Sequence, residues 1–365
     1  MTSVLTDRPS SPAAPTPARH RWWQHPRALV GLLSLAALLY VMAPTGLQVG
    51  LENRRGALRN TVTQSDTPLA FVQGADLANI PAVLDAWAQL GDKPLVISYH
   101  DIALIGTSTY SVTPEAFAQQ MALLEAMQVH ALTSSEFRAY TEGAKVPPRS
   151  IMITFDDGAR GVYRFADRIL AQHNFHAVAF IITGFVGTRA PYYMTWKELD
   201  TLALTGRWDF EAHTNVGHTK IPVDAIGTTG SYISNLEWIP AKSRLETVAE
   251  QRLRIETDLD ICIKELASRG YGQGRLFAFP FSDYGAPSNN PEVGPVLLAV
   301  TSARFSSVFT DDVKPHPLAG PFQFNRLSIS KEVTNTSLLA NLSEAIDLTK
   351  KSPDGIAPTG YTTSS

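Results

Sequence analysis

Short apolar runs alternate with amphipathic segments along the chain from Lys93 onward. The runs have the length of buried strands, and the segments between them repeat apolar residues at helical spacing. This alternation predicts a parallel α/β sheet or barrel, and the pattern alone does not separate an open sheet from a closed or incomplete barrel. The predicted strands are PLVISYH, SIMITFDD, AVAFIITG, WDFEAHT, RLFAFPF, SSVFTD and FNRLSIS.

Capping residues mark where several of the predicted helices begin. A Thr or Ser before the first turn accepts a backbone hydrogen bond, and a Glu three residues later returns one. Pro is favoured at the first helical position. The predicted starts are Thr113 before Pro114, Thr195 with Glu198, and Ser243 with Glu246, whose long helix ends at Gly270.

The N-terminal part of the chain differs from the rest. Residues 28–49 carry no charge over about the 20 residues that a membrane-spanning helix needs. The preceding stretch RHRWWQHPR is basic and aromatic, which is typical of a membrane interface. We predict an uncleaved single-pass anchor, with a cleaved signal peptide as the alternative. The predicted regions are a disordered tail (1–27), the anchor (28–49), a juxtamembrane connector (50–92), the α/β domain (93–348) and a second disordered tail (349–365).

Composition narrows the class of protein. Hydrophobic residues make up 44% of the chain, which is enough for a sizeable core. The net charge of −3 gives no indication of a nucleic-acid partner. Cys262 is the single cysteine, so an internal disulfide is excluded, and its place on an amphipathic helix predicts a core residue.

Polar residues follow three of the predicted strands. Because parallel strands end at the same edge, we expect these side chains to converge. Two imidazoles and one carboxylate are a common ligand set for a catalytic divalent metal, and a second carboxylate beside it is suited to act as general base on water. The metal is expected to be Zn²⁺, with Ni²⁺, Co²⁺ or Fe²⁺ as alternatives. Taken singly, each signal has a plainer interpretation: Asp-Asp-Gly as a turn, and the histidines as core residues. The residues are His100, Asp101, Asp156, Asp157, His213 and His218.

Three of these stretches, ITFDDG, AHTNVGH and FAFPFSDYG in that order, resemble the polysaccharide deacetylases of carbohydrate esterase family 4, the NodB-like domain. The opening VISYHDI and the five-residue histidine spacing look most like the branch that deacetylates poly-β-1,6-N-acetylglucosamine. The resemblance implies a distorted, incomplete (β/α)7-type barrel that hydrolyses N-acetyl groups. It implies that Asp156 is the catalytic base, that Asp157, His213 and His218 hold the metal, and that the backbone N–H of Phe281, after Pro280, stabilises the oxyanion.

The sequence departs from the family pattern at two places. The family's third motif carries an arginine that orients the base, and Ala278 stands there in FAFPF. The late Leu-x-x-His motif that supplies a general acid has no clear match, although His316 comes at about its place. We consider His100 and Asp101 as alternative supports for the base or the substrate.

The leading hypothesis is therefore a membrane-anchored, metal-dependent hydrolase with its catalytic domain outside the cytoplasm, acting on a polymeric N-acetylglucosamine glycan. One alternative is a non-catalytic module that binds glycan or docks a glycan synthase, which the missing arginine favours. Another is a peptidoglycan N-acetylglucosamine deacetylase. Several aromatic residues are expected either to stack on sugar rings or to anchor loops: Tyr192, Tyr193, Trp196, Tyr232 and Trp238.

Overall fold

The computed structural model describes residue 72 and residues 74–105, 108–189, 191–285, 288–312 and 322–351. The predicted anchor, 28–49, lies outside these residues, as does the predicted tail 1–27. No helix in the described part of the chain combines the length and apolarity that crossing a bilayer requires.

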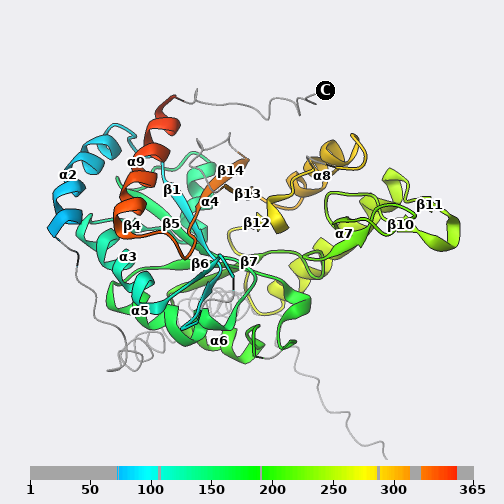
Figure 1. Ribbon diagram of the computed structural model, residues 1–365, viewed down its shortest axis with the longest axis horizontal. Helices are drawn as coiled ribbons and strands as arrows, with labels where there is room; N and C mark the ends of the chain where they lie inside the picture. Colours follow the sequence, from blue (N-terminus) through cyan, green and yellow to red (C-terminus); the bar gives the residue numbers. More distant parts are fainter. Residues whose placement is uncertain are drawn as a thin grey trace, which may run out of the picture. The chain divides into compact units, whose positions relative to one another are not determined.

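Parallel strands form the centre of the fold, with helices between them in the chain (Figure 1). The central strands are β1 (Leu95–Tyr99), β4 (His130–Ala131), β5 (Ser150–Phe155), β6 (Ala177–Ile181), β7 (Trp208–Ala212), β12 (Leu276–Ala278), β13 (Ser307–Asp312) and β14 (Gln323–Ser328). The α-helices are α2 (Gly74–Ala88), α3 (Pro114–Ala126), α4 (Ser134–Thr141), α5 (Asp167–Gln172), α6 (Trp196–Thr205), α7 (Val248–Ala267), α8 (Val293–Ser302) and α9 (Asn335–Lys351).

Smaller elements lie outside the central sheet. Strands β2 and β3 pair in parallel, whereas β8–β9 and β10–β11 are antiparallel pairs within the long excursion between β7 and α7. Their bounds are β2 (Asp101–Ile102), β3 (Ser111–Val112), β8 (Lys220–Pro222), β9 (Thr229–Ser231), β10 (Trp238–Ile239) and β11 (Arg244–Leu245). Short 3-10 turns are η3 (Thr183–Phe185), η4 (Pro240–Lys242) and η5 (Pro280–Ser282), and η2 (Val162–Ala166) is a π-helical turn.

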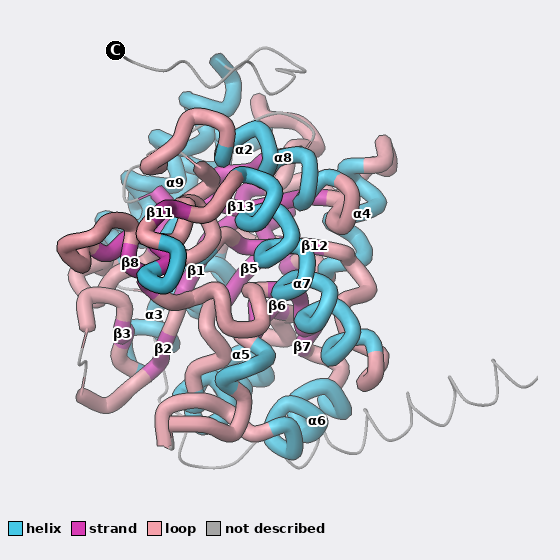
Figure 2. Tube along the Cα trace, turned by 90° about the vertical axis from the view of Figure 1, so that its right-hand side faces the viewer, coloured by secondary structure: helices cyan, strands magenta, loops and turns pink. Residues whose placement is uncertain are grey.

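Seven of the central strands form a closed parallel barrel, in the order β1, β14, β13, β12, β7, β6, β5 and back to β1. Strand β4 adds to the beginning of β5, on the edge that β6 occupies at its end. The weakest joint is between β7 and β12, where Ala212 and Phe277 form a single residue pair. The expected (β/α)7-type barrel is confirmed, but the ring of pairings is complete rather than incomplete. Figure 2 shows helices α5, α6, α7, α8 and α9 around these strands.

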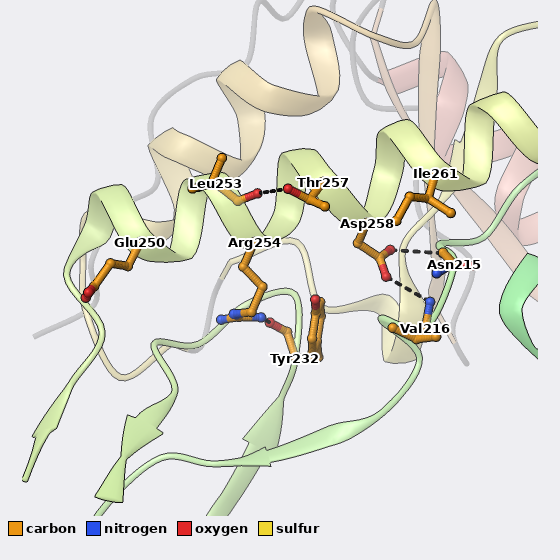
Figure 3. Close-up of a pocket in the computed structure, with 9 residues that line it drawn as sticks. All are labelled: Asn215, Val216, Tyr232, Glu250, Leu253, Arg254, Thr257, Asp258 and Ile261. Carbon is orange, nitrogen blue, oxygen red and sulfur yellow. Dashed lines mark hydrogen bonds between the residues drawn. The ribbon is translucent and has the colours of Figure 1, made fainter. Parts of the chain in front are cut away.

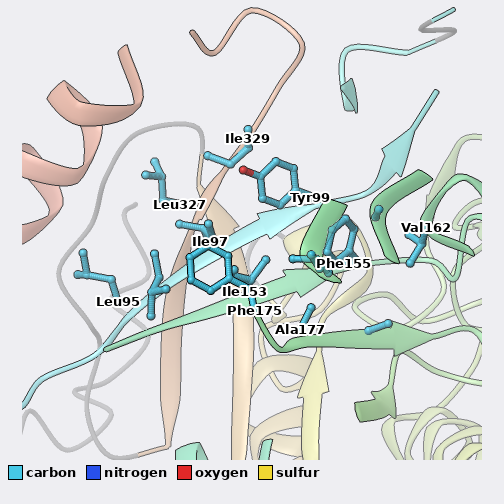
Figure 4. Close-up of a cluster of buried hydrophobic side chains, with 14 of the residues drawn as sticks. Leu95, Ile97, Tyr99, Ile153, Phe155, Val162, Phe175, Ala177, Leu327 and Ile329 are labelled. Atoms are coloured by element: carbon cyan, nitrogen blue, oxygen red, sulfur yellow. The ribbon is translucent and has the colours of Figure 1, made fainter. Parts of the chain in front are cut away.

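Alternation along the strands separates the inside of the barrel from its helix-covered outside. On β5, Ile151, Ile153 and Phe155 belong to the outer core that packs against the helices (Figure 4). Their neighbour Met152 belongs to a second apolar cluster formed by alternate residues of the strands together with Phe137 of α4. Because side chains alternate strictly, the next inward positions after Met152 are Thr154 and Asp156. The members of the inner cluster are Val96, Leu132, Phe137, Val146, Met152, Val178, Phe180, Leu276, Ala278, Phe309 and Phe324.

Two of the three predicted caps are confirmed and one is wrong. Thr113 accepts the backbone N–H of Ala116, and Thr195 forms the predicted capping box with Glu198. The long helix α7 does not start at Ser243: its capping box is Thr247 with Glu250. The antiparallel β10–β11 pair extends to residue 245 and delays the helix start. Ser243 instead occupies a left-handed turn position with φ 49°.

The described fold begins before Lys93. Helix α2 falls in the stretch predicted to be a connector, yet Ile80, Val83 and Trp87 are buried in the main core. Helix α2 packs against α9, and the Oγ1 of Thr336 donates a 2.7 Å hydrogen bond to Asp76. Segment 74–88 is therefore part of the domain rather than a free linker.

A buried carboxylate on β7 is expected to make stability fall as pH rises. Glu211 is 1% exposed and accepts the backbone N–H groups of Gly274 and Leu276 at 2.7 and 3.0 Å. Burial raises the pKa of Glu211 from 4.5 to about 7. Between these values the native state retains a proton that the unfolded chain releases, so the free energy of unfolding declines with increasing pH.

The measurement is urea unfolding on both sides of that pH window. Glu211→Gln should reduce the decline by roughly 1–3 kcal/mol, because glutamine does not titrate. Glu265→Gln, the same change at an exposed position, is the control and should retain the wild-type slope. Equal slopes for all three proteins would contradict the assignment.

Candidate active site

The two adjacent aspartates after β5 point to different partners because the chain turns sharply between them. Asp156 continues the inward alternation of β5, and its N–H bonds to the carbonyl of Tyr99. Asp157 has a left-handed backbone with φ 71°, as has Gly158 with φ 80°. This conformation is unusual for a residue with a side chain and turns the second carboxylate away from the first.

Asp157 lies against the two predicted histidine ligands. Its Oδ1 is 3.5 Å from Nε2 of His213 and 3.3 Å from Nε2 of His218. The ligand atoms of a tetrahedral zinc site lie roughly 3.3 Å apart, given bonds of about 2.0–2.1 Å. Asp157 Oδ1 is buried without a hydrogen-bond partner among the described residues, as expected for an atom that binds a cation. The donor set and its spacing fit a divalent metal.

Hydrogen bonding sets the tautomer of His213, and burial and nearby charges shift the pKa values of both histidines. His213 Nδ1 is 2.8 Å from the carbonyl oxygen of Ala278, so it donates there and leaves Nε2 as the ligand atom. Burial alone would lower the pKa of His213, but the carboxylates of Asp156 and Asp157 raise it. Burial and the neighbouring His213 lower the pKa of His218 to about 4, which keeps that ring neutral at physiological pH.

The arginine that the third motif lacks is supplied by another strand. Arg326 of β14 donates to both carboxylate oxygens of Asp156, from Nη1 at 2.7 Å and from Nη2 at 2.6 Å. Its side chain is 0% exposed, and that of Asp156 is 3% exposed. A fork of two parallel hydrogen bonds between buried charges is strong and fixes orientation. Burial opposes ionisation of Asp156, but the Arg326 guanidinium holds the pKa of this carboxyl below its usual value.

Arg326 also binds a second carboxylate. Its Nε lies 2.7 Å from Oδ1 of Asp311 on β13. Burial and the charge of Asp156 raise the pKa of Asp311, so the two acids that share one guanidinium are driven apart in pKa. His100, Asp156 and Asp311 could geometrically form a second metal cluster. Because the guanidinium of Arg326 already contacts both carboxylates, we assign this cluster to support of the base.

The predicted supports His100 and Asp101 occupy separate places. His100 Nε2 is 3.9 Å from Asp311, and its ring stacks on Tyr110 at 4.7 Å. Asp101 lies instead against the backbone of Gly161, where an added Cβ would be 2.2 Å from its Oδ1. The ligand atoms of His100, Asp156 and Asp311 lie within 4.8 Å of one another, so His100 stands beside the base, whereas Asp101 shapes the turn after β5.

Pro280 and Phe281 border the metal cluster, as the resemblance implies. The Phe281 ring lies 4.2 Å from that of His218, and Lys220 Nζ lies 3.8 Å from the Phe281 ring centre. Phe281 has φ 58°, a strained conformation for an aromatic residue, and its side chain is 43% exposed at the rim. Its backbone N–H as oxyanion donor stays a prediction.

The other aromatic candidates divide into anchors and a rim residue. Tyr232 lies under the guanidinium of Arg254 at 4.3 Å, and Trp196 under that of Arg269 at 4.3 Å. Both rings are therefore occupied by a cation, which favours the anchoring interpretation. Tyr192 is 40% exposed, packs edge-on against Tyr193 at 4.8 Å and stays available at the surface. Trp238 is half-buried on β10, and His316 lies outside the described residues.

Sequence reasoning missed Arg326 and Asp311, although both strands were predicted. Alternation carried the signal: Arg326 shares a face with Phe324, and Asp311 shares one with Phe309. A charged residue at an inward position of a buried strand requires a partner of opposite charge. The pattern could have indicated that the two pair with something inside the barrel, though not with Asp156.

Comparisons with known proteins match the part of the chain that carries this site. The polysaccharide deacetylase family model matches residues 143–290, a stretch that includes Asp156, Asp157, His213 and His218. The poly-β-1,6-N-acetyl-D-glucosamine N-deacetylases of Staphylococcus epidermidis and Staphylococcus aureus are each 38% identical over 112 residues. These matches cover 30% of this chain and 39% of each relative, so the chain spans about two fifths of the length of these relatives.

Solved structures share the fold. A de-N-acetylase from Aggregatibacter actinomycetemcomitans superposes with a TM-score of 0.58 and 16% identity, covering 68% of this chain and 99% of that one. The BpsB deacetylase domain from Bordetella bronchiseptica superposes with a TM-score of 0.52 and 20% identity, covering 64% and 95%. Residues 143–290 are therefore similar to the polysaccharide deacetylase family, and the chain shares its seven-stranded parallel barrel fold with these solved structures.

Proposed function

We propose that this protein is a metal-dependent N-deacetylase that removes acetyl groups from poly-β-1,6-N-acetylglucosamine. The observation that carries the proposal is the arrangement of Asp156: buried, ionised by Arg326, and directly next to the Asp157–His213–His218 cluster. A pure glycan-binding module has no need for a buried base beside a metal site. The substrate class is supported by the names of the staphylococcal relatives.

In this proposal three residues bind the metal, and Asp156 accepts the proton from water. Asp157, His213 and His218 would hold the cation, which when bound supplies a Lewis acid and lowers the pKa of a coordinated water. Asp156 has a lowered pKa, so it is in the basic form at neutral pH but is a weak base. Asp156 is therefore suited to accept a proton only from a water molecule whose pKa a bound cation has already lowered.

The proton balance follows from the same residues. As water attacks the acetamide carbon, its proton passes to Asp156, and the carbonyl oxygen gains negative charge that the Phe281 N–H would stabilise. The carbon–nitrogen bond then breaks as the sugar nitrogen takes up the proton that Asp156 carries. The remaining carboxylic acid proton passes to the freed amine, so acetate and an ammonium sugar leave and Asp156 is again a carboxylate. Arg326 keeps the carboxylate of Asp156 oriented throughout, because both of its oxygens are held.

Acetate release from β-1,6-linked oligo-N-acetylglucosamine tests the proposal. We expect the full-length chain to release acetate with at least one of Zn²⁺, Ni²⁺, Co²⁺ and Fe²⁺, and Asp156→Asn to lower kcat by at least about 100-fold, since amide cannot accept the proton. Asp260→Asn, the same change at a surface position on α7, is the control. If wild type releases no more acetate than Asp156→Asn with any of these metals, the enzyme hypothesis is wrong. That result would favour a glycan-binding or synthase-docking module.

A substrate panel decides the linkage. Activity on peptidoglycan N-acetylglucosamine but not on β-1,6-linked oligomers would move the protein to the peptidoglycan deacetylases.

Anchoring to the membrane, with the catalytic domain outside the cytoplasm, is part of the proposal and is supported by the uncharged run 28–49. Fractionation of cells that express the full chain, with and without that segment, tests it.

A further inference from the structure

The loop that separates the two histidine ligands is held in place from a neighbouring helix. Asp258 of α7 accepts the backbone N–H of Asn215 on Oδ2 at 2.9 Å and that of Val216 on Oδ1 at 2.8 Å (Figure 3). Both donors lie between His213 and His218. Each carboxylate oxygen of Asp258 therefore has its own backbone donor within the metal-binding loop.

The 3-10 turn η3, which follows β6, also holds this loop. The N–H of Thr183 donates to the carbonyl of Thr214 at 3.1 Å, and the N–H of Gly184 donates to that of Asn215 at 2.9 Å. An added Cβ on Gly184 would stand 2.6 Å from the Asn215 carbonyl oxygen, so the two backbones approach as closely as glycine permits. The loop is thus fixed through its carbonyls by η3 and through its amides by α7.

The loop needs such restraint because its backbone is strained. Thr214 follows the ligand His213 with φ 74°, a left-handed conformation that costs free energy for a β-branched residue. Without external hydrogen bonds, residues 214–217 would relax and carry His218 away from Asp157. The structure instead keeps Nε2 of His218 3.3 Å from Asp157 Oδ1.

Burying the carboxylate of Asp258 costs free energy, which its hydrogen bonds to the loop offset. The residue is 4% exposed, so ionising it there means removing a charge from water. The cation closest along the helix, Arg254, directs its hydrogen bonds to Glu246 and to the carbonyls of Tyr232 and Asn235. The Asp258 carboxylate thus accepts its hydrogen bonds from the loop amides of Asn215 and Val216.

We propose that Asp258 is a positioning residue that sets the spacing of His213 and His218 before the metal binds. The inference rests on the metal site of the proposed function. Asp258 touches neither the metal nor the substrate, and acts only through the backbone of Asn215 and Val216. Its removal should weaken metal binding more than it slows the chemistry of the loaded site.

Asp258→Asn is the decisive variant. The amide keeps the shape of the side chain but offers one acceptor oxygen, so its NH₂ group faces one of the two backbone N–H donors and that hydrogen bond is lost. Calorimetry with Zn²⁺ alone should show an affinity on the order of 10- to 100-fold weaker than wild type. With excess Zn²⁺, kcat should return to near the wild-type value. Asp260→Asn, two residues along the same helix and exposed, should bind Zn²⁺ as wild type does.

Hydrogen exchange gives a second measurement that needs no variant. In the metal-free wild-type protein, the amides of Asn215 and Val216 should already be protected, because Asp258 holds them before metal arrives. Fast exchange of both amides in the metal-free protein would overturn the inference, as would equal Zn²⁺ affinity of Asp258→Asn and Asp260→Asn. Failure of the wild type itself to bind any metal would instead overturn the proposed function.

Discussion

Replacing Arg326 with methionine is expected to abolish measurable deacetylation at neutral pH and to destabilise the barrel. The change leaves Asp156 and Asp311 buried next to each other without the cation that both contact. Breaking a buried ion pair from one side typically costs about 3–5 kcal/mol, because the remaining charge is uncompensated. The activity at neutral pH should fall by at least about 100-fold, since the base becomes protonated.

The pH profile separates the catalytic effect from the structural one. Arg326 lowers the pKa of Asp156, so in its absence that pKa rises, and the acid limb of the kcat/KM profile should move to higher pH. Residual activity should therefore recover partly as the pH is raised. Arg326→Lys should show a smaller shift, because one ammonium group cannot hold both oxygens in a fork.

Arg252→Met serves as the control, because this exposed arginine pairs only with Glu256 one turn along α7 among the ion pairs of the described residues. It should change neither stability nor the pH profile noticeably. An acid limb that stays in place in Arg326→Met, with the fold intact by circular dichroism, would mean that Arg326 does not set the ionisation of Asp156.

Replacing His213 with alanine is the second change with a large expected effect. His213 is 1% exposed and lies next to Asp157, His218 and Asp156, so its loss removes one ligand and leaves two. We expect the purified wild-type chain to carry about one equivalent of a divalent metal and the variant to carry almost none. Acetate release should fall to the level of Asp156→Asn.

Elemental analysis after removal of loosely bound ions measures this directly. His130→Ala, at a half-buried histidine that pairs with Glu136 away from the cluster, controls for the general effect of removing an imidazole. Retention of a full equivalent of metal in His213→Ala would place the metal elsewhere in the protein, and the assignment of Asp157 as its carboxylate ligand would fall with it.

The elements of the barrel were predictable from local pattern because each depends on its own side chains. A run such as SIMITF buries both faces and so forms a strand wherever it lies, and Thr195 caps its helix through atoms three residues away. The same holds for the candidate metal ligands, since Asp157 follows one predicted strand and His213 another. The start of α7 was missed for the opposite reason: Ser243 is taken up by a hairpin that forms only in three dimensions.

The partner of Asp156, the proposed base, could not be predicted in this way. Arg326 and Asp156 are 170 residues apart, and no local rule connects them. They meet because β14 closes the barrel against β1, which places the inward positions of three strands around one point. Local pattern was enough to predict the strands of the barrel and the candidate residues Asp156, Asp157, His213 and His218. Only closure of the barrel pairs Asp156 with the guanidinium of Arg326. Closure removes Arg326, Asp156 and Asp311 from solvent at the same place, so their charges must compensate one another.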